Sequence, residues 1–179
     1  MRPPTLDPVP KKGRRPSFCL TMRTLVLGLG NPLLKDDSAG LRVAQELRAR
    51  LADQEGVEVD IDYWGGLRLM ERLVGYDRAI IVDAICTGQA PAGTLHWLKV
   101  GDIPTQRSAS SHDMNLPTAL QLGRQAGAHL PENEHIALLG IEAADVQTFD
   151  EQLSPVVADA IPRAVEAILA ALARDSFPL

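Results

Sequence analysis

The 179-residue sequence has few cysteines, few aromatic residues and no long hydrophobic run. Its two cysteines, Cys19 and Cys86, supply neither a disulfide framework nor a Cys-x-x-Cys motif, so we expect a protein of the reducing cytoplasm. No apolar stretch approaches the ~18 residues that a membrane-spanning helix needs, so no membrane partner is expected. Aromatic residues make up only 4% of the chain, and the core must therefore consist mainly of Leu, Val, Ile and Ala.

The sequence also lacks an excess of positive charge. Its 18 Lys and Arg residues against 23 Asp and Glu give a net charge of -5. Nucleic acids and anionic membranes attract basic surfaces, so neither is expected as a partner. The chain does have 45% hydrophobic and 23% charged residues, which is typical of a globular protein, and the length of one domain. A monomer is favoured over an oligomer.

The first 22 residues differ in composition from the rest of the chain. They contain five prolines and a basic cluster that includes Arg14-Arg15. A twin-arginine export signal would continue into an apolar stretch, and that stretch is missing. We therefore expect 1–22 to be a disordered extension, 23–174 to be a single α/β domain, and 175–179 to be a tail.

From residue 24 onward, short apolar runs alternate with amphipathic stretches. Continuous or alternating apolar residues predict strands, and apolar residues three to four positions apart predict helices. Strands are expected over 24–29, 57–61, 78–83, 93–100 and 135–141. Helices are expected over 38–51, with Ser38 as N-cap, and over 67–73, 116–126 and 154–172, the last kinked or broken by Pro162.

This order of elements predicts a three-layer α/β fold of the flavodoxin or phosphorylase type. A mostly parallel, twisted sheet of about five strands would have helices on both faces, with the first strand between the second and third. The fourth strand is expected to be antiparallel or at an edge. Ligands of such sheets bind at the carboxyl ends of the strands, where the connections diverge. Here the crevice would lie between the first and third strands, whose ends carry Asp37 and Asp83.

The segment from Gly28 to Gly40 opens like a dinucleotide-binding loop. The third glycine of G-x-G-x-x-G would fall at Leu33, and Asp36 and Asp37 would face the pyrophosphate, so we do not expect a nucleotide. The two acids precede a predicted helix, whose dipole favours negative charge. We interpret Asp36 mainly as a helix cap. Asp37 is a candidate ligand, with capping as the alternative.

Two further residues complete the candidate site. Asp83 closes a buried apolar strand, where a carboxylate loses solvation and needs a partner or a cation, although acids also end strands by chance. His112 lies in a polar loop, and alone it would be an ordinary surface residue. Two carboxylates and one imidazole suit a divalent ion such as nickel, zinc, manganese or iron. The other histidines, His96, His129 and His135, are interpreted as structural.

Cys86 follows the third strand and offers a second kind of chemistry. Together with His112 it could form the thiolate–imidazole pair of a thiol hydrolase. A small apolar side chain in a turn at the end of a strand is the commoner role of such a cysteine. The thiol hydrolase is therefore the less favoured reading.

Several short motifs follow one another in a recognisable order. They are Gly28-x-Gly30-Asn31-x-Leu33-x-x-Asp36-Asp37-x-x-Gly40, Gly65-Gly66, Ile80-Ile81-Val82-Asp83-Ala84, Pro91-Ala92-Gly93-Thr94, Ser111-His112-x-x-x-Leu116, Gly140-Ile141-Glu142 and Leu153-Ser154-Pro155-x-Val157. With these motifs the chain resembles the hydrogenase maturation endopeptidases, which trim the C-terminal tail of the large subunit of nickel–iron hydrogenases. The resemblance runs from about Arg23 to about Leu172. Family members usually carry Asp directly before the glycine pair, where this chain has Trp64.

The resemblance implies a hydrolase that makes a single cut in a nickel-loaded large-subunit precursor, an endopeptidase of the aspartyl class. Asp37, Asp83 and His112 would bind the nickel of that precursor rather than a permanently bound ion, so that cleavage checks metal insertion. Asp37 or Asp83 would assist the attack of water on the peptide, with polarisation by the metal as the alternative.

Two other functions compete with this one. A nickel-sensing maturation chaperone that does not cleave would use the same three ligands. The opening Gly28-Leu29-Gly30-Asn31-Pro32 also resembles the peptidyl-tRNA hydrolases. That family has an Arg-His-Asn segment that is missing here, and the acidic pI disfavours a tRNA substrate.

Overall fold

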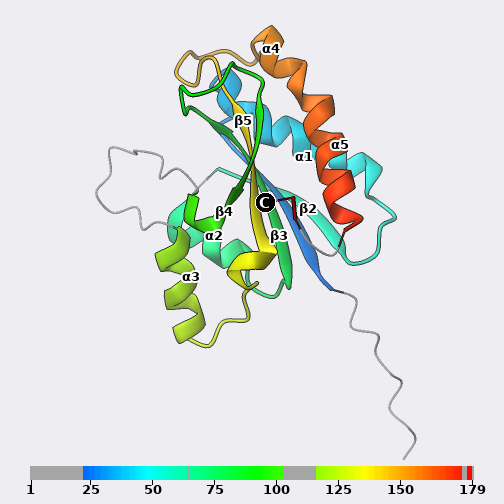
Figure 1. Ribbon diagram of the computed structural model, residues 1–179, viewed down its shortest axis with the longest axis vertical. Helices are drawn as coiled ribbons and strands as arrows, with labels where there is room; N and C mark the ends of the chain where they lie inside the picture. Colours follow the sequence, from blue (N-terminus) through cyan, green and yellow to red (C-terminus); the bar gives the residue numbers. More distant parts are fainter. Residues whose placement is uncertain (1–21, 64, 103–115, 175–176, 179) are drawn as a thin grey trace, which may run out of the picture.

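The computed structural model describes residues 22–63, 65–102, 116–174 and 177–178 (Figure 1). The predicted extension up to residue 21, Trp64 and His112 lie outside the described residues. Within them, five strands form one sheet in the order β2-β1-β3-β5-β4. The strands are β1 (Thr24–Leu29), β2 (Val57–Asp62), β3 (Arg78–Ile85), β4 (Leu95–Lys99) and β5 (Ile136–Glu142).

The pairing confirms the predicted flavodoxin-like arrangement. β1 lies between β2 and β3 and is parallel to both, and β3 is parallel to β5. β4 pairs with β5 in the antiparallel direction at the edge of the sheet. The chain is thus an α/β fold with a mostly parallel sheet, as its alternating apolar and amphipathic segments predict.

Helices cover both faces of the sheet (Figure 1). α1 (Ala39–Arg50) and α5 (Ala160–Leu172) pack on one face. α2 (Gly66–Arg72) and α3 (Leu116–Gln125) pack on the other. A short helix, α4 (Pro155–Ala158), precedes α5, and three 3-10 turns, η1 (Asp36–Ser38), η2 (Val100–Asp102) and η3 (Asn133–His135), complete the elements. In the described part of the chain, no helix is both long and apolar enough to cross a bilayer.

The three central strands are buried because helices cover them on both sides. Along β3, Ile80 and Val82 face the layer of α1 and α5, whereas Ile81 and Ile85 face the layer of α2 and α3. Side chains alternate between the faces of a strand, so Asp83 belongs to the same face as Ile81 and Ile85. The continuous apolar pattern of β3 thus reflects two cores, one on each side of the sheet.

The structure corrects three boundaries. β3 continues to Ile85, so Asp83 lies within the strand and does not end it. The predicted helix 154–172 is divided at Asp159, which confirms the break expected near Pro162 and moves its position to three residues before the proline. Pro162 then lies in the first turn of α5, where a missing N–H is tolerated. His135 belongs to η3 and not to the following strand.

The C-terminal end of the chain is packed against the sheet. Phe177 is buried and stacks on Trp97, with 6.3 Å between the ring centroids. The guanidinium of the buried Arg78 lies 4.1 Å from the centroid of the Phe177 ring and donates hydrogen bonds to the carbonyls of Ala171 and Arg174. These contacts hold the end of α5 over the amino-terminal end of β3.

Candidate active site

The site predicted from the sequence lies where β1 and β3 end. The two strands are parallel neighbours with Gly28 opposite Val82, so the turn that carries Asp37 and the end of β3 that carries Asp83 leave the same edge of the sheet. In Figure 1 this is the upper edge, where the start of α1 and the connections that follow β3 and β5 also gather. Topology therefore brings the two acids to one place, as predicted.

Glycines let the turn with Asp37 pack directly onto the strands. A Cβ atom at Gly40 would overlap the carbonyl oxygens of Leu29 and Val82, and one at Gly30 would overlap the carbonyl oxygen of Asp37. Gly30 also has a φ of 144°, a conformation that other residues rarely adopt. The first turn of α1 therefore rests on the backbone of β1 and β3, which fixes the position of Asp37.

The carboxylate of Asp37 interacts with the loop that follows β1. Its Oδ2 accepts a hydrogen bond of 2.8 Å from the backbone N–H of Asn31. Burial raises the pKa of Asp37 above its ordinary value, and this hydrogen bond opposes the rise. The side chain does not cap a helix, so the capping alternative for Asp37 is wrong.

Asp83 is the most strongly perturbed acid of the site. Its pKa is raised to about 8, first by burial and then by the negative charge of Asp37, while a hydrogen bond from the Ala84 N–H opposes the rise. The two carboxyl groups are therefore close enough for the charge of one to disfavour ionisation of the other. A carboxyl group whose pKa is raised to about 8 suits acid–base chemistry near neutral pH, and a divalent cation would relieve the repulsion between the two acids.

Asp36 has a different role from the helix cap that the sequence predicted. It is completely buried, and no side chain caps η1 or α1. The Asp36 carboxylate instead accepts hydrogen bonds from the segment after β5: from the N–H groups of Ala144 and Asp145 and from the N–H and hydroxyl of Ser154. Ser38 occupies the N-cap position of α1, but its hydroxyl donates to the carbonyl of Lys35 at 2.9 Å. The capping interpretation is thus wrong for Asp36.

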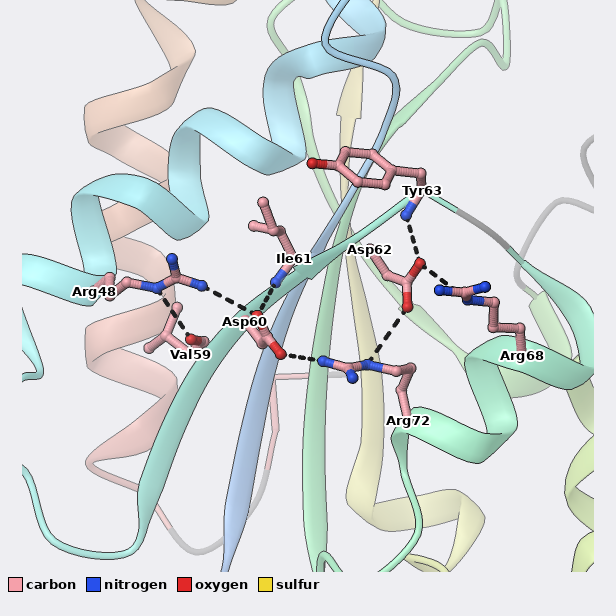
Figure 2. A network of polar contacts seen from close by, with 8 residues as sticks. All are labelled: Arg48, Val59, Asp60, Ile61, Asp62, Tyr63, Arg68 and Arg72. Carbon is pink, nitrogen blue, oxygen red and sulfur yellow. Dashed lines mark hydrogen bonds and ion pairs between the residues drawn. The ribbon is translucent and has the colours of Figure 1, made fainter.

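A third acid at this edge, Asp62, was missed by the sequence reasoning. It ends β2 opposite Leu29 and is buried, and it belongs to the network of arginines and acids shown in Figure 2. Its oxygens lie 3.5 Å from Nε of Arg68 and 3.4 Å from Nε of Arg72, which also binds Asp60. Asp62 is thus compensated by two arginines of α2. No signal in the sequence marks it, since it occupies the same alternating positions of β2 as Glu58 and Asp60.

Glu142 is a second buried acid that residue-level reasoning did not single out. It ends β5 and accepts hydrogen bonds from the N–H and hydroxyl of Thr87 and from the N–H of Gly88, at 2.8 to 2.9 Å. His96 Nε2 lies 3.5 Å from its Oε2. Glu142 therefore anchors the loop that begins just after Asp83 and Cys86. A buried strand closing on an acid, the same signal as in β3, marks it in the sequence.

Cys86 is an exposed thiol in this loop. Burial, followed by the charges of Glu142, Asp37, Asp36 and Asp83, raises its pKa above the ordinary value. A thiol surrounded by acids stays protonated near neutral pH, and the protonated form is a poor nucleophile. The electrostatics of the site therefore disfavour the thiol hydrolase reading.

Of the three predicted metal ligands, Asp37 and Asp83 lie in the part of the chain that the structure describes. Among the described residues, no three His, Cys, Asp or Glu side chains come together in a metal-binding group. The predicted third ligand, His112, falls in 103–115, which is outside the described residues. His129 lies after α3, 3.1 Å from Asp77, and His96 belongs to β4, so neither joins the pair.

Comparisons with known proteins agree with this geometry. The sequence profile of the family described as hydrogenase maturation protease matches residues 41–171. The hydrogenase 2 maturation protease of Escherichia coli is 31% identical over 84% of this chain and 91% of its own length. The hydrogenase expression/formation protein HupD of Bradyrhizobium diazoefficiens is 30% identical over 80% of this chain and 74% of its own.

Solved structures show the same fold. The hydrogenase maturating endopeptidase HybD of Escherichia coli superposes with a TM-score of 0.65 at 30% identity, covering 85% of this chain and 93% of its own. The hydrogenase 2 maturation peptidase of a Thaumarchaeota archaeon superposes with a TM-score of 0.61 at 27% identity, covering 84% of this chain and 98% of its own. The structural similarity thus extends over more than four fifths of the chain.

Proposed function

The chain belongs to the hydrogenase maturation protease family, and from this premise we propose that it removes the C-terminal extension of a nickel-loaded hydrogenase large-subunit precursor. Membership makes it an endopeptidase, a hydrolase that acts in hydrogenase maturation. The observation that carries the finer proposal is the coupled pair Asp37 and Asp83 at the end of the central strands. Burial raises the pKa of both carboxyl groups, and the negative charge of Asp37 raises that of Asp83 further.

The nickel of the precursor is the substrate feature that this pair fits. Two carboxylates whose ionisation is disfavoured gain when a divalent cation neutralises them, and oxygen ligands with one imidazole can hold nickel. In this proposal Asp37 and Asp83 bind the nickel from the side of the enzyme, and His112 is the third ligand. Nickel must displace the proton of Asp83, so it binds better as the pH rises toward the pKa of Asp83.

The chemical step that we propose is general-base hydrolysis. A carboxylate of the pair takes a proton from water while the water oxygen attacks the scissile carbonyl. The C–N bond then breaks, and the proton passes to the departing amine. Polarisation of the scissile carbonyl by the nickel is the competing account of the same step.

The proposal also includes the cellular compartment of the reaction and the oligomeric state of the protein. We place it in the cytoplasm, with the protein acting as a monomer on a folded precursor. Cleavage would then report that nickel has been inserted. The alternative of a nickel-sensing chaperone that does not cleave is disfavoured, because the curated and structural relatives are named as proteases and endopeptidases.

The test is cleavage of a nickel-loaded precursor, followed by mass spectrometry of the products. Wild type and Asp53→Asn, a control that changes an exposed acid after α1, are expected to release one C-terminal fragment. Asp37→Asn is expected to lower the rate at least about 100-fold, since general-base catalysis contributes that much or more. The precursor without nickel is expected to stay intact.

Each other result has a definite meaning. If wild type releases no fragment under any condition, the protein does not process this precursor and the chaperone becomes the better account. If Asp37→Asn cleaves as fast as wild type, the protease assignment holds and the proposed chemistry is wrong.

A further inference from the structure

Asp36 joins two parts of the chain that are far apart in sequence. One is the turn with Asp37, and the other is the segment from β5 to α4, more than 100 residues later. Oδ2 of Asp36 accepts from the N–H groups of Ala144 and Asp145 and from the hydroxyl of Ser154, each at 2.9 Å. Oδ1 accepts from the N–H of Ser154 at 2.7 Å.

Only a carboxylate satisfies all four donors. An amide of the same shape has one oxygen and one NH₂ group, so it always places an N–H against another N–H. With its nitrogen in place of Oδ1, it would oppose the N–H of Ser154. With its nitrogen in place of Oδ2, it would oppose the N–H groups of Ala144 and Asp145. The arrangement therefore depends on the acceptor chemistry of Asp36 and not only on its size.

Backbone hydrogen bonds continue the same junction. The N–H of Asp36 donates to the carbonyl of Asp145, and the N–H of Lys35 donates to the carbonyl of Thr148, both at 3.0 Å. The N–H of Asp150 donates to the carbonyl of Leu33 at 3.2 Å. These hydrogen bonds and the four to the Asp36 carboxylate attach the turn before α1 to the segment after β5. We call the whole set the Asp36 clamp.

The clamp acts directly on Asp37. Asp36 and Asp37 are consecutive residues of η1, so a shift of one moves the other. The Asp37 backbone already rests on Gly30, and its Oδ2 receives the N–H of Asn31. The turn with Asp37 thus contacts Gly30 and Asn31 after β1, and through Asp36 it contacts the segment after β5. Both sets of contacts fix its position.

We propose that Asp36 is a positioning residue of the protease: its carboxylate, held by Ala144, Asp145 and Ser154, sets the orientation of the Asp37 carboxylate toward Asp83. Asp36 itself is buried and does not touch the substrate. This inference rests on the proposed role of Asp37 in cleavage. It adds that the segment after β5 contributes to the active site through Asp36.

The test compares Asp36→Asn with two controls. Asp53→Asn makes the same chemical change at an exposed acid after α1, away from the junction. Val165→Ala removes two methyl groups from the buried face of α5, away from the site, and lowers stability without touching the clamp. Ser154→Ala removes one of the four donors and serves as the milder variant if Asp36→Asn folds poorly.

The first readout is the kinetics of precursor cleavage at a temperature where near-ultraviolet circular dichroism shows every variant folded. Asp36→Asn is expected to lower kcat about 10- to 100-fold, the usual effect of removing a group that orients an active-site ligand, with KM unchanged. Ser154→Ala should lower kcat by less. Asp53→Asn and Val165→Ala should keep the wild-type kcat. Equal kcat values for Asp36→Asn and Val165→Ala would make Asp36 merely structural and overturn the inference.

The second readout does not depend on cleavage. The amide proton of Asn31 reports its hydrogen bond to Asp37, and loss of that bond shifts its NMR resonance upfield. We expect the shift in Asp36→Asn and not in Val165→Ala or Asp53→Asn. An unchanged Asn31 resonance in Asp36→Asn would refute the positioning role even if wild type showed no protease activity, so the two proposals can fail separately.

Discussion

Two neighbouring regions of this protein treat buried acids in opposite ways. In the clamp, Asp36 is completely buried and its carboxylate receives four hydrogen bonds. In the adjoining pair, burial raises the pKa of Asp37 and Asp83, and the charge of Asp37 raises that of Asp83 further. Asp36 and Asp37 are consecutive aspartates, but the first is held by hydrogen bonds and the second lies where burial disfavours its charged form.

The difference separates acids that hold the fold from acids available for chemistry. Asp36, Asp62 and Glu142 are each compensated by hydrogen-bond donors or arginines, so their charge stabilises a particular arrangement of loops. The environment of Asp83 disfavours its charged form, which is costly for stability and useful for binding a proton or a cation. Burial of an acid alone is thus a weak indicator of function, and the raised pKa values of Asp37 and Asp83 are the reason to propose a site there.

The largest effect on the contrast between the two groups of acids is expected from replacing the carboxyl group of Asp83 by an amide. Asp83→Asn is expected to lower kcat/KM for the nickel-loaded precursor by a factor of about 100 to 10⁴, because it removes an ionisable carboxyl group that the proposed chemistry requires. Mass spectrometry of the released fragment measures the rate, with Asp53→Asn as the matched control. Wild-type activity in Asp83→Asn would remove Asp83 from the proposed site.

The same variant should be more stable than wild type. The pKa of Asp83 is about 8 in the folded protein and 3.8 ordinarily, so the unfolded chain releases this proton first. Folding is therefore increasingly disfavoured as the pH rises from about 4 to about 8, and the cost is constant above that window. Asp83→Asn lacks this cost and should gain on the order of 3 kcal/mol at pH 7.

Urea unfolding at several pH values measures this effect. The stability difference between Asp83→Asn and wild type should grow between pH 5 and pH 8 and vanish toward pH 4, where wild type is protonated in both states. A difference that does not change with pH would contradict the raised pKa.

Removal of a compensated acid should have the opposite sign. Glu142→Ala leaves the N–H groups of Thr87 and Gly88 without their acceptor and is expected to destabilise the protein by about 2 kcal/mol. Glu166→Ala, which breaks an exposed ion pair with Arg50, should cost less than about 1 kcal/mol. Thermal or urea unfolding compares the two, and equal losses would show that Glu142 does not anchor its loop.

The smallest effect is expected at Cys86. Surrounding acids raise the pKa of its thiol, so Cys86→Ala should cleave the precursor at the wild-type rate. The measurement is the same fragment assay. Loss of activity at unchanged stability would restore the thiol hydrolase reading.

Much of the fold could be predicted from the sequence because its signals are local. Continuous apolar runs mark β1 and β3, and apolar residues at helical spacing mark α1 and α3. The handedness of parallel crossovers then limits the arrangement of the strands. From that topology alone, Asp37 and Asp83 could be placed at one edge of the sheet.

The roles of the other acids could not be predicted in this way. Asp36 looks like a helix cap because it precedes α1, but its partners at 144, 145 and 154 are far along the chain. Asp62 and Glu142 likewise depend on contacts with α2 and with the turn after β3. Local spacing carries no information about donors that arrive from another part of the fold.

The sequence by itself therefore determined the α/β class, the strand order and the two acids of the candidate site, because hydrophobic periodicity and crossover geometry are properties of short segments. Only the tertiary structure decided which acids are compensated and which are perturbed. The state of a carboxylate depends on the donors, charges and solvent within a few ångströms, and distant segments supply these when the chain folds. This is why Asp36 and Asp37, adjacent in the sequence, differ in what they do.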